Sequence, residues 1–230
     1  SAEFVITDSF HGMAFSIIFN KNFLVFLNKE RGASRFTSLL SDLGLEKRVI
    51  NNLNFKESNF SEINWKSVNN KLKKREGNIF LINGLIESMI GSQDQSIINY
   101  NKALDIYNKY NDKIGLITTK INLGKTYKSN WDIETALEYF ESSLEISKSI
   151  KDSIQISTSL TNIGNAYFIV YKFQKAIPYF EKSISISDKI GDKRGSLISK
   201  GNLANIFLKS KKVEEGLELI TNVISKAENE

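Results

Sequence analysis

Apolar residues follow two different patterns along the chain. Near the N-terminus they form short runs at residues 3–7 and 23–27, which are typical of buried strands. We expect a helix over residues 9–20 between these strands and a further small strand at 49–50. From residue 61 onward the apolar residues recur every three or four positions, which indicates amphipathic helices. The patterns predict an α/β segment followed by an all-α part.

The helical part repeats itself. From about residue 114, sequence features return with a period of 40, so that Asn122-Leu123-Gly124 recurs as Asn162-Ile163-Gly164 and Asn202-Leu203-Ala204. Phe140 recurs as Phe180, and Gly84 lies 40 positions before Gly124. Each unit is expected to be a pair of antiparallel helices, the first carrying small residues where its partner must approach closely. The predicted boundaries are an α/β segment at 1–60, a long connecting helix at 61–90 that Gly77 kinks or breaks, and a repeat region at 91–230. The repeat units are expected at about 79–114, 115–154, 155–194 and 195–230. The first unit is degenerate and begins inside the connecting helix.

The candidate chemistry lies beside the first two strands. Ser9 is positioned to cap the helix that follows, so His11 and Gly12 fall in its first turn. Free backbone N–H groups and the helix dipole favour an anion there, and the imidazole suits a group that exchanges protons near neutral pH. The polar segment 28–35 follows the second strand. In open α/β sheets ligands bind in a crevice at the carboxyl ends of the strands, so this segment and the start of the first helix are expected to line the same crevice. That segment supplies the cations Lys29, Arg31 and Arg35.

Several ordered motifs within residues 1–85 resemble the C-terminal part of the polysaccharide pyruvyl transferase family. They are Val5-Ile6-Thr7-Asp8-Ser9-Phe10-His11-Gly12, Asn28-Lys29-Glu30-Arg31-Gly32, Ser34-Arg35-Phe36 and Ile63-Asn64-Trp65. The resemblance implies two Rossmann-like halves, of which this part supplies much of the phosphoenolpyruvate site. The implied reaction transfers a pyruvyl unit, as a ketal, onto two hydroxyls of a sugar in a surface glycan.

Within that resemblance we expect His11 to be the catalytic group. Ser9, Gly12, Lys29, Arg31 and Arg35 are expected to bind the donor. Many members of the family carry arginine where this chain has Ser9, whose hydroxyl can still donate a hydrogen bond. The acceptor implied is a glycan or a lipid-linked sugar.

The 40-residue units resemble tetratricopeptide (TPR) repeats in a variant with long helices. In the register of such repeats, six polar residues fall on the concave face that the first helices line: Asn122, Lys125, Asn162, Asn165, Asn202 and Asn205. Asparagine both donates and accepts hydrogen bonds, so a ladder of them suits an extended peptide backbone. A protein or peptide partner is therefore expected on this face.

The composition limits which partners and cofactors are expected. The formal net charge is +5 and the lysines are scattered, so nucleic acid is not an expected partner. The chain has no cysteine and one histidine, so we expect no metal and no cofactor, with phosphoenolpyruvate entering as a donor substrate. The apolar run 13–19 is far too short for a membrane span, and a cytoplasmic chain is expected. Because the sequence opens with Ser1 just before a strand, we infer a fragment of a longer protein.

Three functions follow from these patterns. The first is the donor-site portion of a pyruvyl transferase of surface-glycan biosynthesis with an attached interaction domain, inactive as an isolated fragment. The second is a TPR peptide-binding scaffold joined to a non-catalytic transferase remnant. The third is a purely structural oligomerisation element.

Overall fold

The structure is a computed structural model that describes residues 4–27, 33–50 and 61–227, without the side chains of 33–35 and 222–227. The chain divides into two compact units, Ser1–Arg75 and Glu76–Glu230. The division falls inside one long helix, α3 (Trp65–Met89). Each unit is described separately below.

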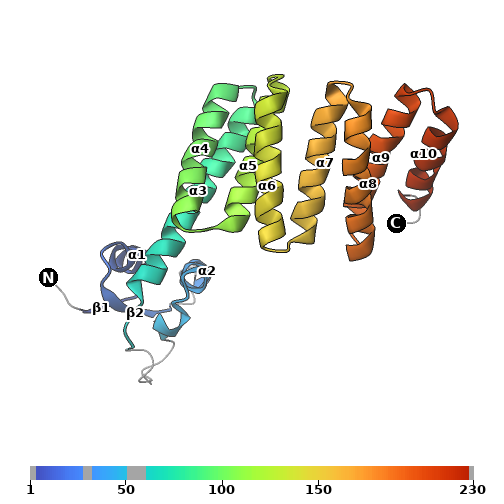
Figure 1. Cartoon of the computed structure of the whole chain (residues 1–230). Helices are drawn as coiled ribbons and strands as arrows, with labels where there is room; N and C mark the ends of the chain where they lie inside the picture. The colour runs from blue at the N-terminus through green and yellow to red at the C-terminus, as the bar shows by residue number, and fades with distance from the viewer. Residues whose placement is uncertain (1–3, 28–32, 51–60, 228–230) are drawn as a thin grey trace. The chain divides into compact units, whose positions relative to one another are not determined.

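The N-terminal unit contains a three-stranded parallel sheet of order β1-β2-β3. The strands are β1 (Phe4–Thr7), β2 (Asn22–Phe26) and β3 (Val49–Ile50), and Val5 lies opposite Phe23. Helix α1 (Phe10–Ile18) connects β1 to β2 (Figure 1). Helix α2 (Ala33–Leu43) and the short 3-10 turn η2 (Glu46–Arg48) precede β3. The predicted strands and the helix between the first two are confirmed.

The core of this unit forms around the central strand. Phe23, Leu24 and Val25 are fully buried, as expected for consecutive apolar residues of a strand that has a neighbour on each side. Met13 of α1 and Leu40 of α2 belong to the same buried cluster as Phe23 and Val25. Helix α2 ends at Gly44, whose φ of +72° is the left-handed conformation that favours glycine at a helix end.

The C-terminal unit is a row of helical hairpins (Figure 1). After α3 come seven helices of similar length: α4 (Gln93–Lys109), α5 (Lys113–Ser129), α6 (Ile133–Ser149), α7 (Ser153–Ile169), α8 (Phe173–Ile190), α9 (Lys193–Lys209) and α10 (Val213–Ala227). Sequential helices from α4 onward contact one another, and α7 also contacts both α5 and α9. The odd-numbered helices α5, α7 and α9 therefore form a continuous layer.

The turns between these helices share one geometry. A residue with positive φ recurs every 20 positions, at Gly91, Asn111, Trp131, Lys151, Tyr171, Gly191 and Lys211. In four turns the next residue is an aspartate that caps the following helix: Asp112, Asp132, Asp152 and Asp192. Their carboxylates accept hydrogen bonds of 3.0–3.1 Å from the backbone N–H three residues later.

Glycine–aromatic pairs explain the 40-residue period. A Cβ added at Gly124 would come within 2.5 Å of the Phe140 ring, and one added at Gly164 within 2.9 Å of the Phe180 ring. Gly84 stands in the same relation to Tyr100, at 2.5 Å. In each hairpin the ring of the second helix thus packs directly on the backbone of the first. The predicted repeat is confirmed as a packing unit.

Gly77 does not interrupt its helix, because α3 is continuous from Trp65 to Met89. The expected break is therefore wrong, and the expected kink stays a prediction. A Cβ at Gly77 would lie 2.9 Å from the ring of Tyr107, whose hydroxyl donates a 2.7 Å hydrogen bond to Asn78 Oδ1. The glycine provides room for the Tyr107 ring at a helix–helix contact.

Candidate functional site

The first turn of α1 has the predicted cap geometry. Ser9 has an extended backbone (φ −95°, ψ 132°), and its hydroxyl accepts a 3.5 Å hydrogen bond from the Gly12 N–H. Thr7 at the end of β1 accepts a hydrogen bond from the Ser9 N–H at 3.0 Å. His11 and Gly12 therefore lie where they were expected, at the start of a helix that leaves the carboxyl end of a parallel strand.

Gly12 contributes differently from the expectation. A Cβ at this position would lie 2.5 Å from Thr7 Oγ1, so the missing side chain allows α1 to pack against the end of β1. The glycine is thus required by the contact between helix and strand. Only its backbone N–H remains as a group for a ligand, and Ser9 Oγ accepts from it over a long distance.

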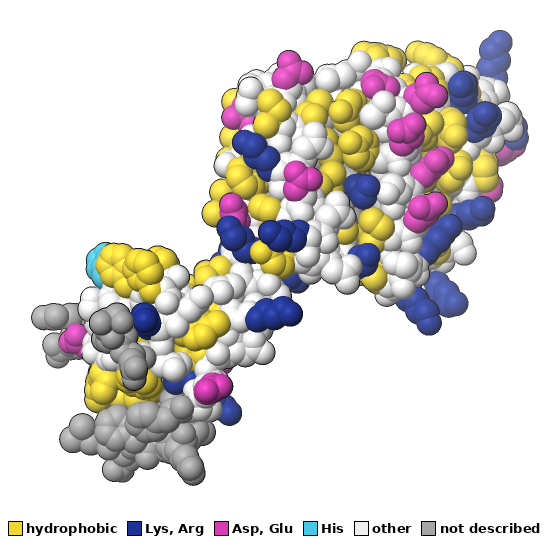
Figure 2. Space-filling view, turned by 60° about the vertical axis from the view of Figure 1, so that its left-hand side comes forward, with side chains coloured by type: hydrophobic (Ala, Val, Ile, Leu, Met, Phe, Trp, Pro, Cys, Tyr) yellow, Lys and Arg dark blue, Asp and Glu magenta, His cyan; other side chains and the backbone are white. Residues whose placement is uncertain are grey.

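His11 is exposed at the surface of this unit, and Figure 2 shows the histidine beside a group of apolar side chains. The Phe10 ring meets the His11 ring edge to face, with 6.4 Å between their centroids, and Phe10 packs in the same way against Phe36 at 5.5 Å. Phe10 thus connects the first turn of α1 to the core, while the imidazole remains open to a ligand.

The three predicted cations cannot be placed together. Lys29 and Arg31 lie outside the described residues. Arg35 was expected in a loop, but α2 begins at Ala33, so Arg35 lies in the first turn of that helix and its side chain is outside the described set. Small and polar residues at 32–34 resemble a loop in sequence, yet Ser and Ala are also compatible with a first helical turn. The convergence of these cations on His11 stays a prediction.

An apolar cavity on α1 was not anticipated from the sequence. It has a volume of about 330 Å³ and is lined by Val5, Gly12, Phe15, Ser16, Phe19 and Lys21. Phe15 and Phe19 stack with their centroids 6.3 Å apart. The apolar run 13–19 predicts a helix. Its periodicity does not indicate which of its aromatic side chains remain exposed to solvent.

The predicted peptide-binding residues lie on α5, α7 and α9 and differ in accessibility. Lys125 and Asn205 are exposed, and Asn122, Asn165 and Asn202 are partly buried. Asn162 is only 7% exposed, and its Nδ2 donates a 2.9 Å hydrogen bond to the Thr158 carbonyl of its own helix. The asparagine ladder is therefore interrupted at its middle position.

Two lysines of α5 form an electrostatic feature that the sequence analysis identified only in part. The side chain of Lys125 is exposed overall, but surrounding protein groups partly desolvate its ammonium group and lower its pKa. Desolvation also lowers the pKa of Lys128, and repulsion from Lys125 lowers it further. They are three residues apart and so lie on one side of the helix. Within the described part of the chain neither ammonium group has an ion-pair partner. Lys128 was missed because only asparagine positions were compared between repeats.

Other site types have no support in the described residues. Among residues 4–27, 33–50 and 61–227, no group of three or more His, Asp or Glu side chains is arranged to hold a metal ion. In the same ranges, none of the helices combines the length and the apolar character that crossing a bilayer requires.

Comparison with family models gives two matches. Residues 1–30 match the model described as polysaccharide pyruvyl transferase. Residues 116–150 and 156–189 match a tetratricopeptide repeat model. No curated protein matches the chain.

Solved structures resemble the chain at low sequence identity. The apo form of RapI matches with a TM-score of 0.62 and 20% identity over 71% of this chain and 63% of its own. A Rap protein in complex with Competence and Sporulation Factor gives 0.63 and 19%, over 70% of this chain and 47% of its own. TPR-like repeats of a putative kinesin light chain from Podosopora anserina give 0.53 and 14%, over 86% and 85%. The chain thus spans about half to two thirds of the Rap proteins that it matches.

These likenesses agree with the observed architecture. Paired helices of equal length, a 40-residue period and glycine–aromatic packing are what TPR units require. The helical unit of this protein has the fold of tetratricopeptide-type repeats.

Proposed function

We propose that the repeat unit binds an acidic segment of a partner protein on the layer formed by α5, α7 and α9. The carrying observation is the pair Lys125 and Lys128, two ammonium groups that are partly desolvated, close to each other and without an ion-pair partner in the described part of the chain. A carboxylate placed between them would offset both the desolvation and the repulsion.

The rest of this layer suits a peptide backbone. Asn165 and Asn205 occupy the position of Lys125 in the next two repeats, and both retain accessible surface. Their amides can donate to and accept from an extended main chain. Two Rap structures with a similar fold are complexes, one with Competence and Sporulation Factor and one, of the plasmid pLS20, with the Phr* peptide.

Selection from a displayed library of random peptides on the full chain tests this function. We expect enriched peptides to carry Asp or Glu, and the double variant Lys125→Gln/Lys128→Gln to bind them about tenfold or more weakly. Lys189→Gln, which removes an exposed charge from α8, is the matched control and should bind as the wild type does. Enrichment without acidic residues, or equal binding by the double variant, would reject the proposal.

We further propose that the N-terminal unit is part of the donor site of a polysaccharide pyruvyl transferase, which acts on a glycan or lipid-linked sugar. Two observations support this: the family match at residues 1–30, and an accessible His11 in the first turn of a capped helix that follows a parallel strand. A helix start of this kind favours the phosphate and carboxylate of phosphoenolpyruvate.

The proposed chemistry requires one proton donor. His11 protonates the methylene carbon of phosphoenolpyruvate while a sugar hydroxyl adds to C2, which turns the methylene into a methyl group. A second hydroxyl of the sugar then replaces the phosphate at C2, which closes the ketal. Lys29, Arg31, Arg35 and the N–H groups of α1 are proposed to stabilise the departing phosphate.

Isothermal titration of phosphoenolpyruvate into the full chain tests the donor site. We expect saturable binding that weakens in Ser9→Ala, and no turnover by this chain alone. In a protein that also holds the second Rossmann-like half, His11→Gln should lower turnover by orders of magnitude without changing the melting temperature. Absence of any binding heat in the wild type, or normal turnover in His11→Gln, would leave only the scaffold function.

A further inference from the structure

A groove runs between the even-numbered helices α6 and α8, and neither lysine of the α5 pair lines it. It encloses about 560 Å³. Its floor is apolar and comes mainly from α7, with Ile156, Leu160 and Ile163. Its walls carry charged groups of both signs, Glu141, Glu145 and Lys148 from α6 and Lys182 from α8.

The repeats allow this groove to be compared with its equivalents in the same molecule. Leu160, in the floor, corresponds to Lys120 one repeat earlier and to Lys200 one repeat later. Only at the central position is the residue apolar. In both neighbouring repeats, therefore, a lysine of the chain itself lies at the site that Leu160 occupies in the central groove.

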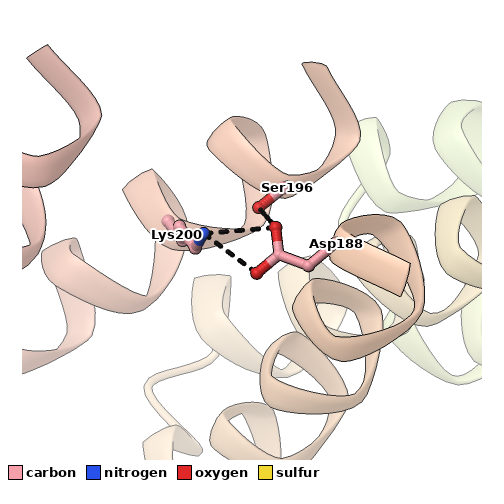
Figure 3. A network of polar contacts seen from close by, with 3 residues as sticks. All are labelled: Asp188, Ser196 and Lys200. Atoms are coloured by element: carbon pink, nitrogen blue, oxygen red, sulfur yellow. Dashed lines mark hydrogen bonds and ion pairs between the residues drawn. The ribbon is translucent and has the colours of Figure 1, made fainter. Parts of the chain in front are cut away.

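The surroundings of the two lysines show which groups stabilise a cation at this position. Lys200 is largely buried, with 12% of its side chain exposed, and its Nζ lies 3.1 and 3.3 Å from the carboxylate oxygens of Asp188. Ser196 donates a 2.5 Å hydrogen bond to the same carboxylate, and Figure 3 shows all three side chains converging from α8 and α9. The cation is thus held between two packed helices by a carboxylate, which the Ser196 hydroxyl also contacts.

Lys120 is held by a ring and a carboxylate. Its Nζ lies 5.7 Å from the centroid of the Tyr139 ring, which stacks on Tyr127 at 5.5 Å. Desolvation lowers the pKa of Lys120, and the charge of Glu145 partly offsets this effect. The position is therefore one where a buried cation finds an aromatic face and an acidic neighbour.

The central groove keeps the aromatic ring but lacks the lysine. At the 40-residue register Ser185 takes the place of Glu145, and Lys148 and Ile156 take the places of Asp188 and Ser196, so its carboxylates come from Glu141 and Glu145 of α6. Tyr179, the equivalent of Tyr139, lines the groove and stacks on Tyr167 at 5.8 Å in the same way. No cation lies over the Tyr179 ring within the described part of the chain. Glu141 lies near Tyr179, since its charge helps to raise the pKa of that phenol. Among the described residues Glu141 has no ion-pair partner.

We propose that the groove between α6 and α8 binds a segment of a partner protein that inserts a lysine or arginine over Leu160. The inserted cation would contact the Tyr179 ring, as Lys120 contacts Tyr139, and the carboxylates of Glu141 and Glu145 that line the groove. Lys148 and Lys182 also lack ion-pair partners in the described residues, so the segment that fits best carries an acidic residue beside the basic one. Its remaining contact is an apolar side chain on Ile156, which is partly exposed.

Differential selection from a displayed library of random peptides tests this site. Peptides are selected on the wild-type full chain and depleted on Leu160→Lys, a variant that copies the residue found at 120 and 200 and so is expected to fold. Peptides bound to α5, α7 and α9 bind both proteins and are removed. We expect the surviving pool to share a lysine or arginine flanked by apolar residues.

The interaction is then measured with a peptide from that pool by fluorescence anisotropy. Leu160→Lys and Glu141→Gln should each weaken binding about tenfold or more, and so should replacement of the basic residue of the peptide by glutamine. Leu160→Met, which keeps an apolar floor of similar volume, should bind nearly as the wild type. A pool without a basic residue, an empty pool, or equal affinity for wild type and Leu160→Lys would overturn the proposal, provided that circular dichroism shows the variant folded.

Discussion

Two sets of aromatic rings, one in each unit of this protein, differ strongly in burial. In the repeat unit Tyr100, Phe140 and Phe180 are at most 1% exposed, each against a glycine of the partner helix. In the N-terminal unit Phe15 of α1 and Phe19, the residue that follows this helix, are 58% and 65% exposed. A repeat finds its packing partner within its own hairpin and in the next one, whereas α1 buries only its inner face. The comparison teaches that an aromatic side chain in an apolar helix is buried only where a neighbouring element covers it.

The largest expected effect is on the repeat core. Phe140→Ala removes a fully buried ring from between two helices and should lower the free energy of unfolding by about 3–5 kcal/mol. Trp131→Ala removes a larger ring, which lies in a turn and is 73% exposed, and should change the free energy of unfolding by less than about 0.5 kcal/mol. Urea unfolding of the full chain, followed by circular dichroism, measures both. Similar losses in the two variants would contradict the packing described for the repeats.

A second effect concerns alkaline pH. Burial and the nearby Asp112 raise the pKa of Tyr107 to about 12, above the ordinary value near 10 that the unfolded chain has. The folded state therefore holds this proton more tightly, and the resulting stabilisation, on the order of 2 kcal/mol, is present below pH 10 and is lost between pH 10 and 12.

Tyr107→Phe isolates that contribution. At neutral pH the variant should be less stable by about 1 kcal/mol, because the hydrogen bond to Asn78 is lost. Above pH 10 its stability should fall less steeply than that of the wild type. Tyr171→Phe, at a residue that is 74% exposed, is the control. Parallel pH profiles for Tyr107→Phe and the wild type would show that Tyr107 is not the group responsible.

Removing a helix N-cap in each unit should have a smaller effect on stability and compares how firmly the two helices begin. Asp152→Ala removes a 3.0 Å hydrogen bond at the start of α7 and should cost about 1 kcal/mol. Ser9→Ala removes a 3.5 Å hydrogen bond at the start of α1 and should cost less. Thermal unfolding of both variants gives the order. A greater loss in Ser9→Ala would mean that the first turn of α1 is held more firmly than its geometry indicates.

The smallest effect is expected on the open face of α1. Ile18 is 64% exposed, so Ile18→Ser should change the free energy of unfolding by no more than about 0.5 kcal/mol. Met13→Ala, on the buried face of the same helix, should cost about 2–5 kcal/mol. If Ile18→Ser destabilises as strongly as Met13→Ala, this face of α1 is covered in solution.

Much of the architecture could be predicted because it depends on local patterns. The 40-residue period is visible in sequence since each glycine and its aromatic partner lie in one hairpin, 16 residues apart, as Gly124 and Phe140 do. The cap of α1 also follows from residues close together in the chain, Ser9 and Gly12.

What escaped prediction depends on contacts between distant residues. Gly77 resembles a helix breaker until Tyr107 is seen against it. Asn162 resembles its counterparts in the other repeats, but it alone among the predicted groove residues is buried. The groove over Leu160 could have been found, because the order Lys120, Leu160, Lys200 stands in the sequence. Comparing charged positions between repeats, as well as core positions, would have identified it.

The central claim is that the repeats recognise an acidic segment through α5, α7 and α9. Hydrogen–deuterium exchange of the full chain, with and without an acidic peptide selected on it, tests this most directly. The account predicts added protection in α5, α7 and α9, and its loss in Lys125→Gln/Lys128→Gln. Protection confined to the even-numbered helices or to α1, or protection that persists in the double variant, would contradict it.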